Sequence, residues 1–92
     1  MSASSDTLHP HVTRTDGVCG GEPVIRDTRF TVRAVVMYVL RLGMTVEEVV
    51  REWPHLAPAQ VYDALSFYYD HQDEIDEAIR KNAASPDERA SA

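Results

Sequence analysis

The chain has 92 residues, of which 43% are hydrophobic and 26% charged, and its formal net charge is −6 at pH 7. This size and composition fit one small globular domain and exclude a fibrous or wholly disordered protein. The longest apolar run, from Val35 to Leu40, is far shorter than the roughly 20 residues that span a bilayer. No export signal follows Met1, and a single cysteine, Cys19, excludes an intramolecular disulfide. We therefore expect a cytoplasmic protein that does not enter a membrane.

The charge is unevenly distributed along the chain. Residues 1–44 contain five arginines and four acidic residues, whereas residues 45–92 contain eleven acidic and four basic residues. Because clustered Lys and Arg side chains drive binding to phosphate, the acidic second half disfavours contact with nucleic acid. Any contact with a polyanion is expected in the first half, where Arg26, Arg29 and Arg33 lie close together.

Both ends of the chain are polar. Residues 1–8 are mostly small and polar, and residues 83–92 include Pro86 and no large apolar side chain. This composition predicts disorder at both ends and a single domain over residues 9–82. About 70 ordered residues give a marginal core. We therefore expect a homodimer or a bound partner.

A β-hairpin is predicted in the first half of the domain. The segments Val24–Arg26 and Arg29–Thr31 flank the dipeptide Asp27-Thr28, and Asp tolerates the left-handed conformation that a tight turn requires. Residues Val12–Arg14 are expected to add a third short strand.

A helical period begins at Val32 and predicts a first helix that ends at Leu42. Thr31 is its expected N-cap, and Gly43 is the expected residue after its C-terminus. The apolar stripe of this helix contains Val32, Val35, Val36, Val39 and Leu40.

Three further helices are predicted. Thr45 and Glu48 form a capping box at the start of the second helix, and Pro54 ends it. The third helix is expected over Pro58–Asp70, and the last over about Gln72–Asn82. The predicted fold is thus mainly α, with a short N-terminal β-hairpin followed by a trihelical core and a C-terminal helix.

The second and third predicted helices have the layout of a helix-turn-helix, in which the N-terminal residues of the second member enter the major groove. Gln60 can read adenine with two hydrogen bonds. The third helix nevertheless contains no Lys or Arg and carries Asp63 and Asp70. The residues of the third helix that are expected to face the major groove of DNA are Ala59, Gln60, Asp63 and Ser66.

Contact with the DNA phosphates is therefore assigned to Arg26, Arg29 and Arg33, and base reading to Gln60. An alternative is that Arg26 and Arg29 stabilise the fold. They would then pair with Glu22 or Asp27, or donate to carbonyls of the glycine-rich turn.

No catalytic constellation is recognisable in the sequence. Apart from Ser66 all serines lie in the tails, and Cys19 has no positively charged neighbour closer than Arg14. The histidines are expected to be surface or capping residues without metal; they are His9, His11, His55 and His71. We expect a protein that is not an enzyme and has no cofactor.

Two aromatic side chains lie away from the predicted core stripe of the third helix. That stripe is centred near Leu65, whereas Phe67 is well off its centre and would be exposed in a monomer unless the last helix covers it. We assign Phe67, together with Tyr62, to a partner or dimer interface.

Four segments together resemble one known family. Residues Val18–Val32 resemble the signature GGxPVIRGTRIPV of the domain of unknown function 433 (DUF433) family. Residues Leu42–Glu48 are similar to its GMSxEE motif, Trp53–Leu56 to YPHL, and Ala64–Tyr69 to ALxYY. The segments occur in the family's order.

The resemblance implies a homeodomain-like trihelical domain with an N-terminal hairpin. It also implies an antitoxin of a type II toxin–antitoxin pair, which binds a PIN-like ribonuclease and, as a dimer, its operator DNA. The alternative is a protein–protein interaction module without a DNA-binding role, which the acidic third and fourth helices favour. The sequence departs from the family pattern at Asp27, usually glycine, and at Ala57, usually a capping Thr or Ser.

Overall fold

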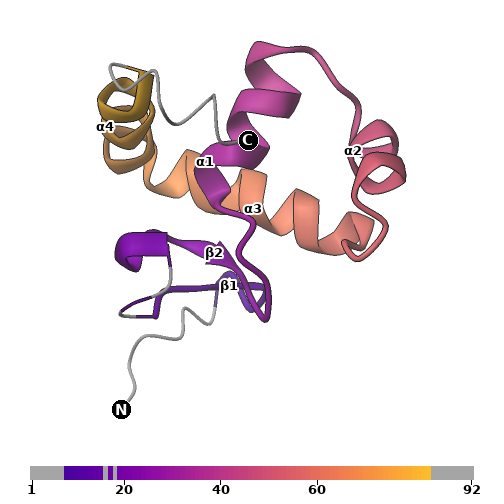
Figure 1. Ribbon diagram of the computed structural model, residues 1–92, viewed down its shortest axis with the longest axis horizontal. Helices are drawn as coiled ribbons and strands as arrows, with labels where there is room; N and C mark the ends of the chain where they lie inside the picture. The colour runs from indigo at the N-terminus through magenta and orange to yellow at the C-terminus, as the bar shows by residue number, and fades with distance from the viewer. Residues whose placement is uncertain (1–7, 16, 18, 84–92) are drawn as a thin grey trace.

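The computed structural model describes residues 8–15, 17 and 19–83, and it is mainly helical with a short antiparallel strand pair near the N-terminus (Figure 1). This architecture confirms the predicted fold class. Nearly all of the two tails predicted to be disordered lies outside the described residues. Within those residues, no helix is long and apolar enough to cross a membrane. The elements are β1 (Val12–Thr13), β2 (Val24–Ile25), α1 (Val32–Val36), α2 (Val46–Glu52), α3 (Pro58–Asp70) and α4 (Gln72–Ala83).

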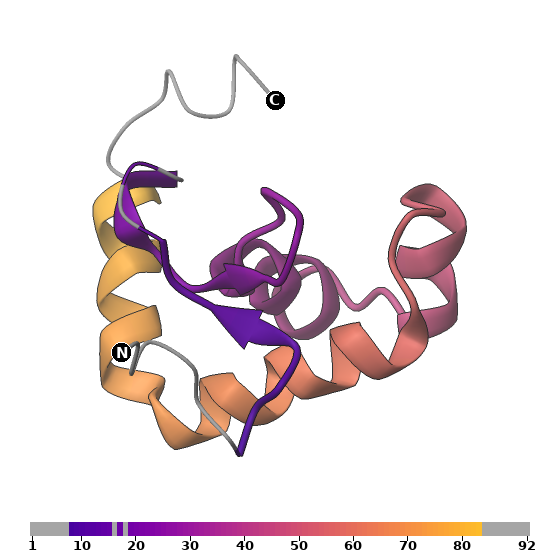
Figure 2. The ribbon, with the colours of Figure 1, turned by 90° about the horizontal axis from the view of Figure 1, so that it is seen from below.

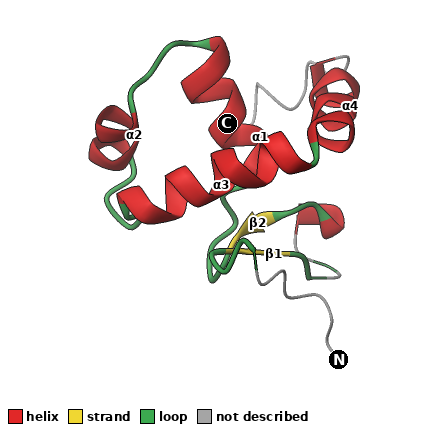
Figure 3. Cartoon of the chain, turned by 180° about the vertical axis from the view of Figure 1, so that it is seen from behind, coloured by secondary structure: helices red, strands yellow, loops and turns green. Residues whose placement is uncertain are grey.

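Helix α3 is the element on which the others are assembled. It contacts α1, α2, α4 and both strands. Helices α2 and α4 stand at its two ends, as Figures 1 and 2 show from two directions. Figure 3 shows the short strand pair beside α3. The buried residues of α3 are Val61, Ala64, Phe67 and Tyr68.

The strand pairing differs from the predicted one. β1 pairs with β2, so that Val12 lies opposite Ile25, whereas the segment expected to pair with β2 makes only an isolated bridge between Thr31 and Val24. The N–H of Ile25 also donates to the carbonyl of Phe30 at 2.9 Å. A longer strand cannot form there because the chain turns into α1 directly after Thr31, whose side chain already serves as the N-cap.

The first helix has the predicted ends, and its predicted face is buried or partly buried except at Leu40. Its N-cap, Thr31, accepts a hydrogen bond from the N–H of Ala34 at 3.0 Å, and Gly43 follows the helix with a φ of 78°. After α1 the helix continues as a π-helical segment, Met37–Arg41. A π turn contains more residues than an α turn, so it shifts the side chains beyond it around the axis. Leu40, predicted to be in the core, is consequently exposed.

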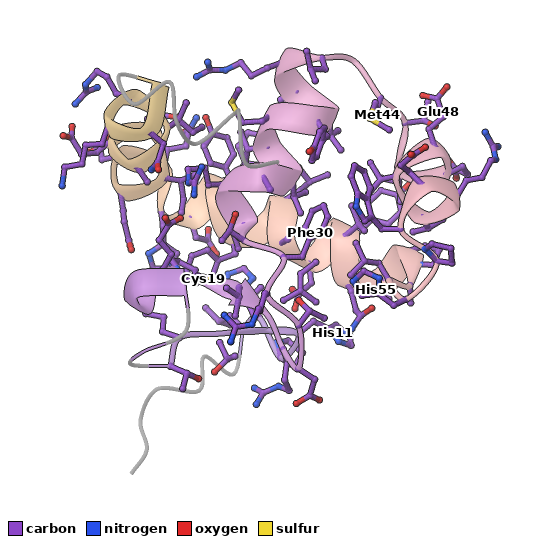
Figure 4. All side chains as sticks on the ribbon, viewed as in Figure 1. His11, Cys19, Phe30, Met44, Glu48 and His55 are labelled. Carbon is purple, nitrogen blue, oxygen red and sulfur yellow. The ribbon has the colours of Figure 1, made fainter. Side chains whose placement is uncertain are left out.

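Helix α2 begins with the predicted capping box. The hydroxyl of Thr45 accepts from the N–H of Glu48 at 3.0 Å, and the Glu48 carboxylate accepts from the N–H of Thr45 at 2.8 Å. Trp53 follows the helix, and its ring packs edge-on against Phe30, which Figure 4 labels, with centroids 5.1 Å apart. The ring of Tyr38 lies 4.7 Å from Trp53. These aromatic contacts join the end of α2 to the segments on both sides of α1.

The capping box allows a direct test of α2. Thr45→Ala removes one acceptor from the exposed helix end and should lower the free energy of unfolding by about 1 kcal/mol. Thr15→Ala is the matched control, because Thr15 is exposed and outside every helix. Urea denaturation of both variants measures the difference. Equal stability of the two variants would contradict the assigned cap.

Candidate functional site

The turn between β2 and α1 forms a groove. Asp27 adopts the predicted left-handed conformation, with a φ of 66°. The hydroxyl of Thr28 fixes the turn, because it donates to the carbonyl of Ile25 at 2.8 Å and accepts from the N–H of Phe30 at 2.9 Å. The groove has a volume of about 400 Å³ and is lined by Thr13, Thr15, Val24, Arg26, Asp27, Thr28 and Arg29. Arginine and threonine side chains are suitable donors to phosphate oxygens.

The three arginines assigned to DNA have different surroundings. Arg29 is exposed, and its guanidinium makes no hydrogen bond or ion pair with the described part of the chain. Arg26 is half-buried, and its Nε donates to the carbonyl of Pro10 at 3.0 Å. Arg33 donates to both carboxylate oxygens of Glu22, at 3.0 and 3.2 Å. The groove thus contains one arginine that is available to a ligand and one that is tied to the N-terminal segment.

The side chain of Gln60 forms a hydrogen bond at the N-terminus of its own helix. Its Oε1 accepts from the N–H of Ala57 at 2.7 Å, at the start of α3. This bond is the N3-to-N-cap half of a capping box, and the other half is missing because Ala57 has no side-chain oxygen to accept from the N–H of Gln60. The residue predicted to read bases is therefore held against the helix end.

Phe67 is not a surface residue, contrary to the expectation from its helical position. Only 3% of it is exposed. The ring stacks on His71 with centroids 4.1 Å apart, and the ring of His9 meets it edge-on at 5.3 Å. The guanidinium of Arg14 lies 5.7 Å from its centroid. The helical wheel could not reveal this burial, because the residues that cover the ring include two from the segment before β2.

His9 is the functional side chain that sequence reasoning missed. It is 1% exposed, although the sequence places it near a frayed end. Its Nε2 lies 2.7 Å from a carboxylate oxygen of Asp70, and its Nδ1 lies 3.3 Å from Asp63. The other oxygen of Asp63 accepts from the N–H of His11 at 2.7 Å. No motif or helical spacing links residues so far apart in the chain.

The outer face of α3 is lined by uncharged side chains, with the partly exposed carboxylate of Asp70 at its border. Tyr62 is 55% exposed and Tyr69 59% exposed, and they lie two helical turns apart on the same side. Ala59 and Ser66, also exposed, continue this face. The acidic residues of α3 lie along a different edge, where they meet His9 and His11. We call this set Ala59, Tyr62, Ser66 and Tyr69 the tyrosine face.

An ion pair joins α4 to the segment after β1. Both guanidinium nitrogens of Arg14 donate to the carboxylate of Glu74, one of them at 2.8 Å. These hydrogen bonds hold the pKa of Glu74 below its ordinary value of 4.5. Among the described residues, no group of three or more His, Cys, Asp or Glu side chains is arranged to hold a metal ion.

These features define a small helical domain in which a short strand pair and an arginine-bearing turn pack on a trihelical core with a fourth helix. The chain belongs to the DUF433 family, described as a protein family of unknown function, whose model matches residues 12–68. The fold is similar to the crystal structure of a DUF433 member from Anabaena variabilis, with a TM-score of 0.73 and 32% identity. That similarity covers 79% of this chain and 71% of the other. No curated protein matches the chain.

The Glu74 carboxylate predicts a pH-dependent contribution to stability. Because its pKa is lowered by folding, the ion pair stabilises the protein above the ordinary pKa of the group, and this stabilisation is lost as the pH falls through the lowered pKa. Both side chains are substantially exposed, so Glu74→Gln should cost about 0.5 kcal/mol at pH 7, and this cost should shrink as the pH is lowered below 4.5. Urea denaturation across this range, with Asp73→Asn as the control, measures the effect. A cost that does not change with pH would exclude the ion pair as its source.

Proposed function

We propose that this protein is a non-catalytic, antitoxin-like binding protein that forms a homodimer. Its tyrosine face holds a PIN-like ribonuclease, and its arginine-bearing groove contacts operator DNA. The tyrosine face is the observation that carries this proposal. On a chain with 26% charged residues and a net charge of −6, one side of the central helix presents two exposed aromatic rings, bordered by the partly exposed carboxylate of Asp70.

The composition of the tyrosine face suits a protein partner. Tyrosine is enriched at protein interfaces because its ring buries a large apolar area while its hydroxyl still forms hydrogen bonds. The small side chains of Ala59 and Ser66 lie along the same face and let a partner approach the helix backbone closely. The face is also part of a well-packed helix, so little conformational entropy is lost when a partner binds.

The groove supplies the proposed contact with DNA. Arg29 is exposed beside the hydroxyls of the groove, and the turn that carries it is fixed by Thr28. A fixed cationic turn can follow a phosphate backbone without reading bases. The negative charge of Asp63 would repel a phosphate, but its two oxygens already face His9 and the N–H of His11.

A second candidate function is a protein–protein interaction module without a DNA-binding role. Two observations favour it: Glu22 pairs with Arg33, and the side-chain carbonyl of Gln60 caps α3. With Arg26, whose Nε donates to the carbonyl of Pro10, three of the four side chains assigned to DNA are thus used within the fold.

The ribonuclease contact can be tested at Tyr62. Tyr62→Ala removes a ring that lies near the middle of the tyrosine face and should weaken binding of a cognate PIN-like ribonuclease at least tenfold. Leu42→Ala is the control, because Leu42 is a large exposed apolar residue outside that face. Calorimetric titration gives the affinities, and light scattering of each variant shows whether the dimer persists. Equal affinities of the two variants would place the contact elsewhere.

The DNA contact can be tested at Arg29. Arg29→Ala should weaken binding evenly across DNA sequences and reduce the slope of log affinity against log salt concentration by about one. Lys81→Ala removes the same charge from an exposed position of α4 and should leave the slope unchanged. Fluorescence anisotropy over a salt series measures both slopes. If the wild-type protein shows no salt-dependent binding to its own promoter, the interaction module is the function.

A further inference from the structure

The segment before β1 is fastened to α3 through one buried side chain. His9 lies between carboxylates of Asp63 and Asp70, which are seven residues apart on α3. The N–H of Val12 donates to the carbonyl of His9 at 3.0 Å. The first residue of β1 is thus hydrogen-bonded to the residue that is attached to α3. The family match covers residues 12–68 and therefore includes neither His9 nor Asp70.

The two contacts of the ring require a particular protonation state. A neutral imidazole has one N–H donor and one nitrogen lone pair, whereas the imidazolium has two donors. Ionised carboxylates only accept hydrogen bonds, and here one faces each ring nitrogen. A neutral ring would therefore direct a lone pair at a carboxylate. The N–H of His11 donates to the other oxygen of Asp63, so both oxygens of that carboxylate face the N-terminal segment.

We propose that His9 is a protonation-dependent clasp, which holds the N-terminal segment on α3 as the imidazolium and loosens when the ring loses a proton. The charged and titratable groups around it come from three parts of the fold. Asp63 and Asp70 lie on α3, His71 follows α3 with its ring 6.4 Å away, and Arg14 and Glu74 form their ion pair beyond Phe67. The two carboxylates in contact with the ring favour the imidazolium over the neutral ring.

The clasp is connected to the arginine-bearing groove by consecutive residues. The carbonyl of Pro10 accepts from the Nε of Arg26, and the carbonyl of His11 accepts from the N–H of Arg26 at 2.7 Å. Both carbonyls belong to the segment that His9 fastens. Loss of the proton therefore loosens the segment that positions Arg26. The effect on Arg26 rests on the proposed function of the groove, whereas the clasp at His9 does not.

The protonation state can be measured directly. In a ¹⁵N NMR spectrum of the imidazole rings at about pH 7.5, where an ordinary histidine is mostly neutral, His9 should still carry both ring protons. His55 is exposed in the turn after α2 and serves as the internal reference. A His9 ring that is neutral at this pH overturns the proposal.

A substitution that removes one carboxylate charge and keeps the shape of the side chain tests the clasp. Asp70→Asn changes a carboxylate that is 55% exposed, and it should make His9 lose its proton at lower pH. Hydrogen exchange of the amides of Val12 and Arg26 at pH 7.5 should then be about tenfold faster. The amide of Val35, in α1, is the reference within the same protein, and Asp73→Asn is the matched control.

The test of the clasp is independent of the tests of the proposed function, because neither the NMR spectrum nor the hydrogen exchange uses DNA or a ribonuclease. Unchanged exchange at Val12 and Arg26 in Asp70→Asn overturns the clasp and leaves the DNA contact of Arg29 standing. Faster exchange together with salt-independent DNA binding supports the clasp and refutes the role of the groove.

Discussion

Burial of one side of α3 is the constraint on which the rest of the structure depends. All the other helices and both strands contact this helix, and its buried residues include Val61, Ala64 and Phe67. Because the partners occupy only part of its circumference, α3 has three distinct sides. An apolar side makes the core, an acidic edge receives His9, and the tyrosine face remains outside. Each proposed role of the protein belongs to one side of this helix or to an element packed against it.

The same constraint changes what a helix-turn-helix layout implies here. In such a motif the start of the second helix reads the major groove. In α3 that region uses Gln60 to cap its own first turn and carries no basic side chain. Its acidic edge is covered by the N-terminal segment, which also supplies the carbonyls that hold Arg26. The positive charge suited to phosphate therefore lies on the hairpin turn, and the fold places that turn beside α3 rather than within it.

How far the sequence predicts this structure depends on the distance over which each interaction acts. The capping box of Thr45 and the positive φ of Asp27 involve a few neighbouring residues, and both were predictable. The burial of Phe67 and the attachment of His9 join residues more than fifty positions apart, for which neither periodicity nor a motif gives a signal. The π-helical turn before Leu42 was also missed, because an apolar stripe is counted on the assumption of 3.6 residues per turn.

The geometry allows the two proposed contacts to be made at the same time. The tyrosine face is exposed, whereas the strands that carry the groove pack against another side of α3. A partner that covers Tyr62 and Tyr69 therefore leaves Arg29 accessible. The charges also favour the assignment of DNA to the groove and of the protein partner to the tyrosine face. Arg29 is a cation without an internal partner among the described residues, and the four residues of the tyrosine face are neutral. Under the proposed function, Arg29 would attract a polyanion to the groove, and an apolar protein surface would cover the tyrosines, whose side chains carry no charge.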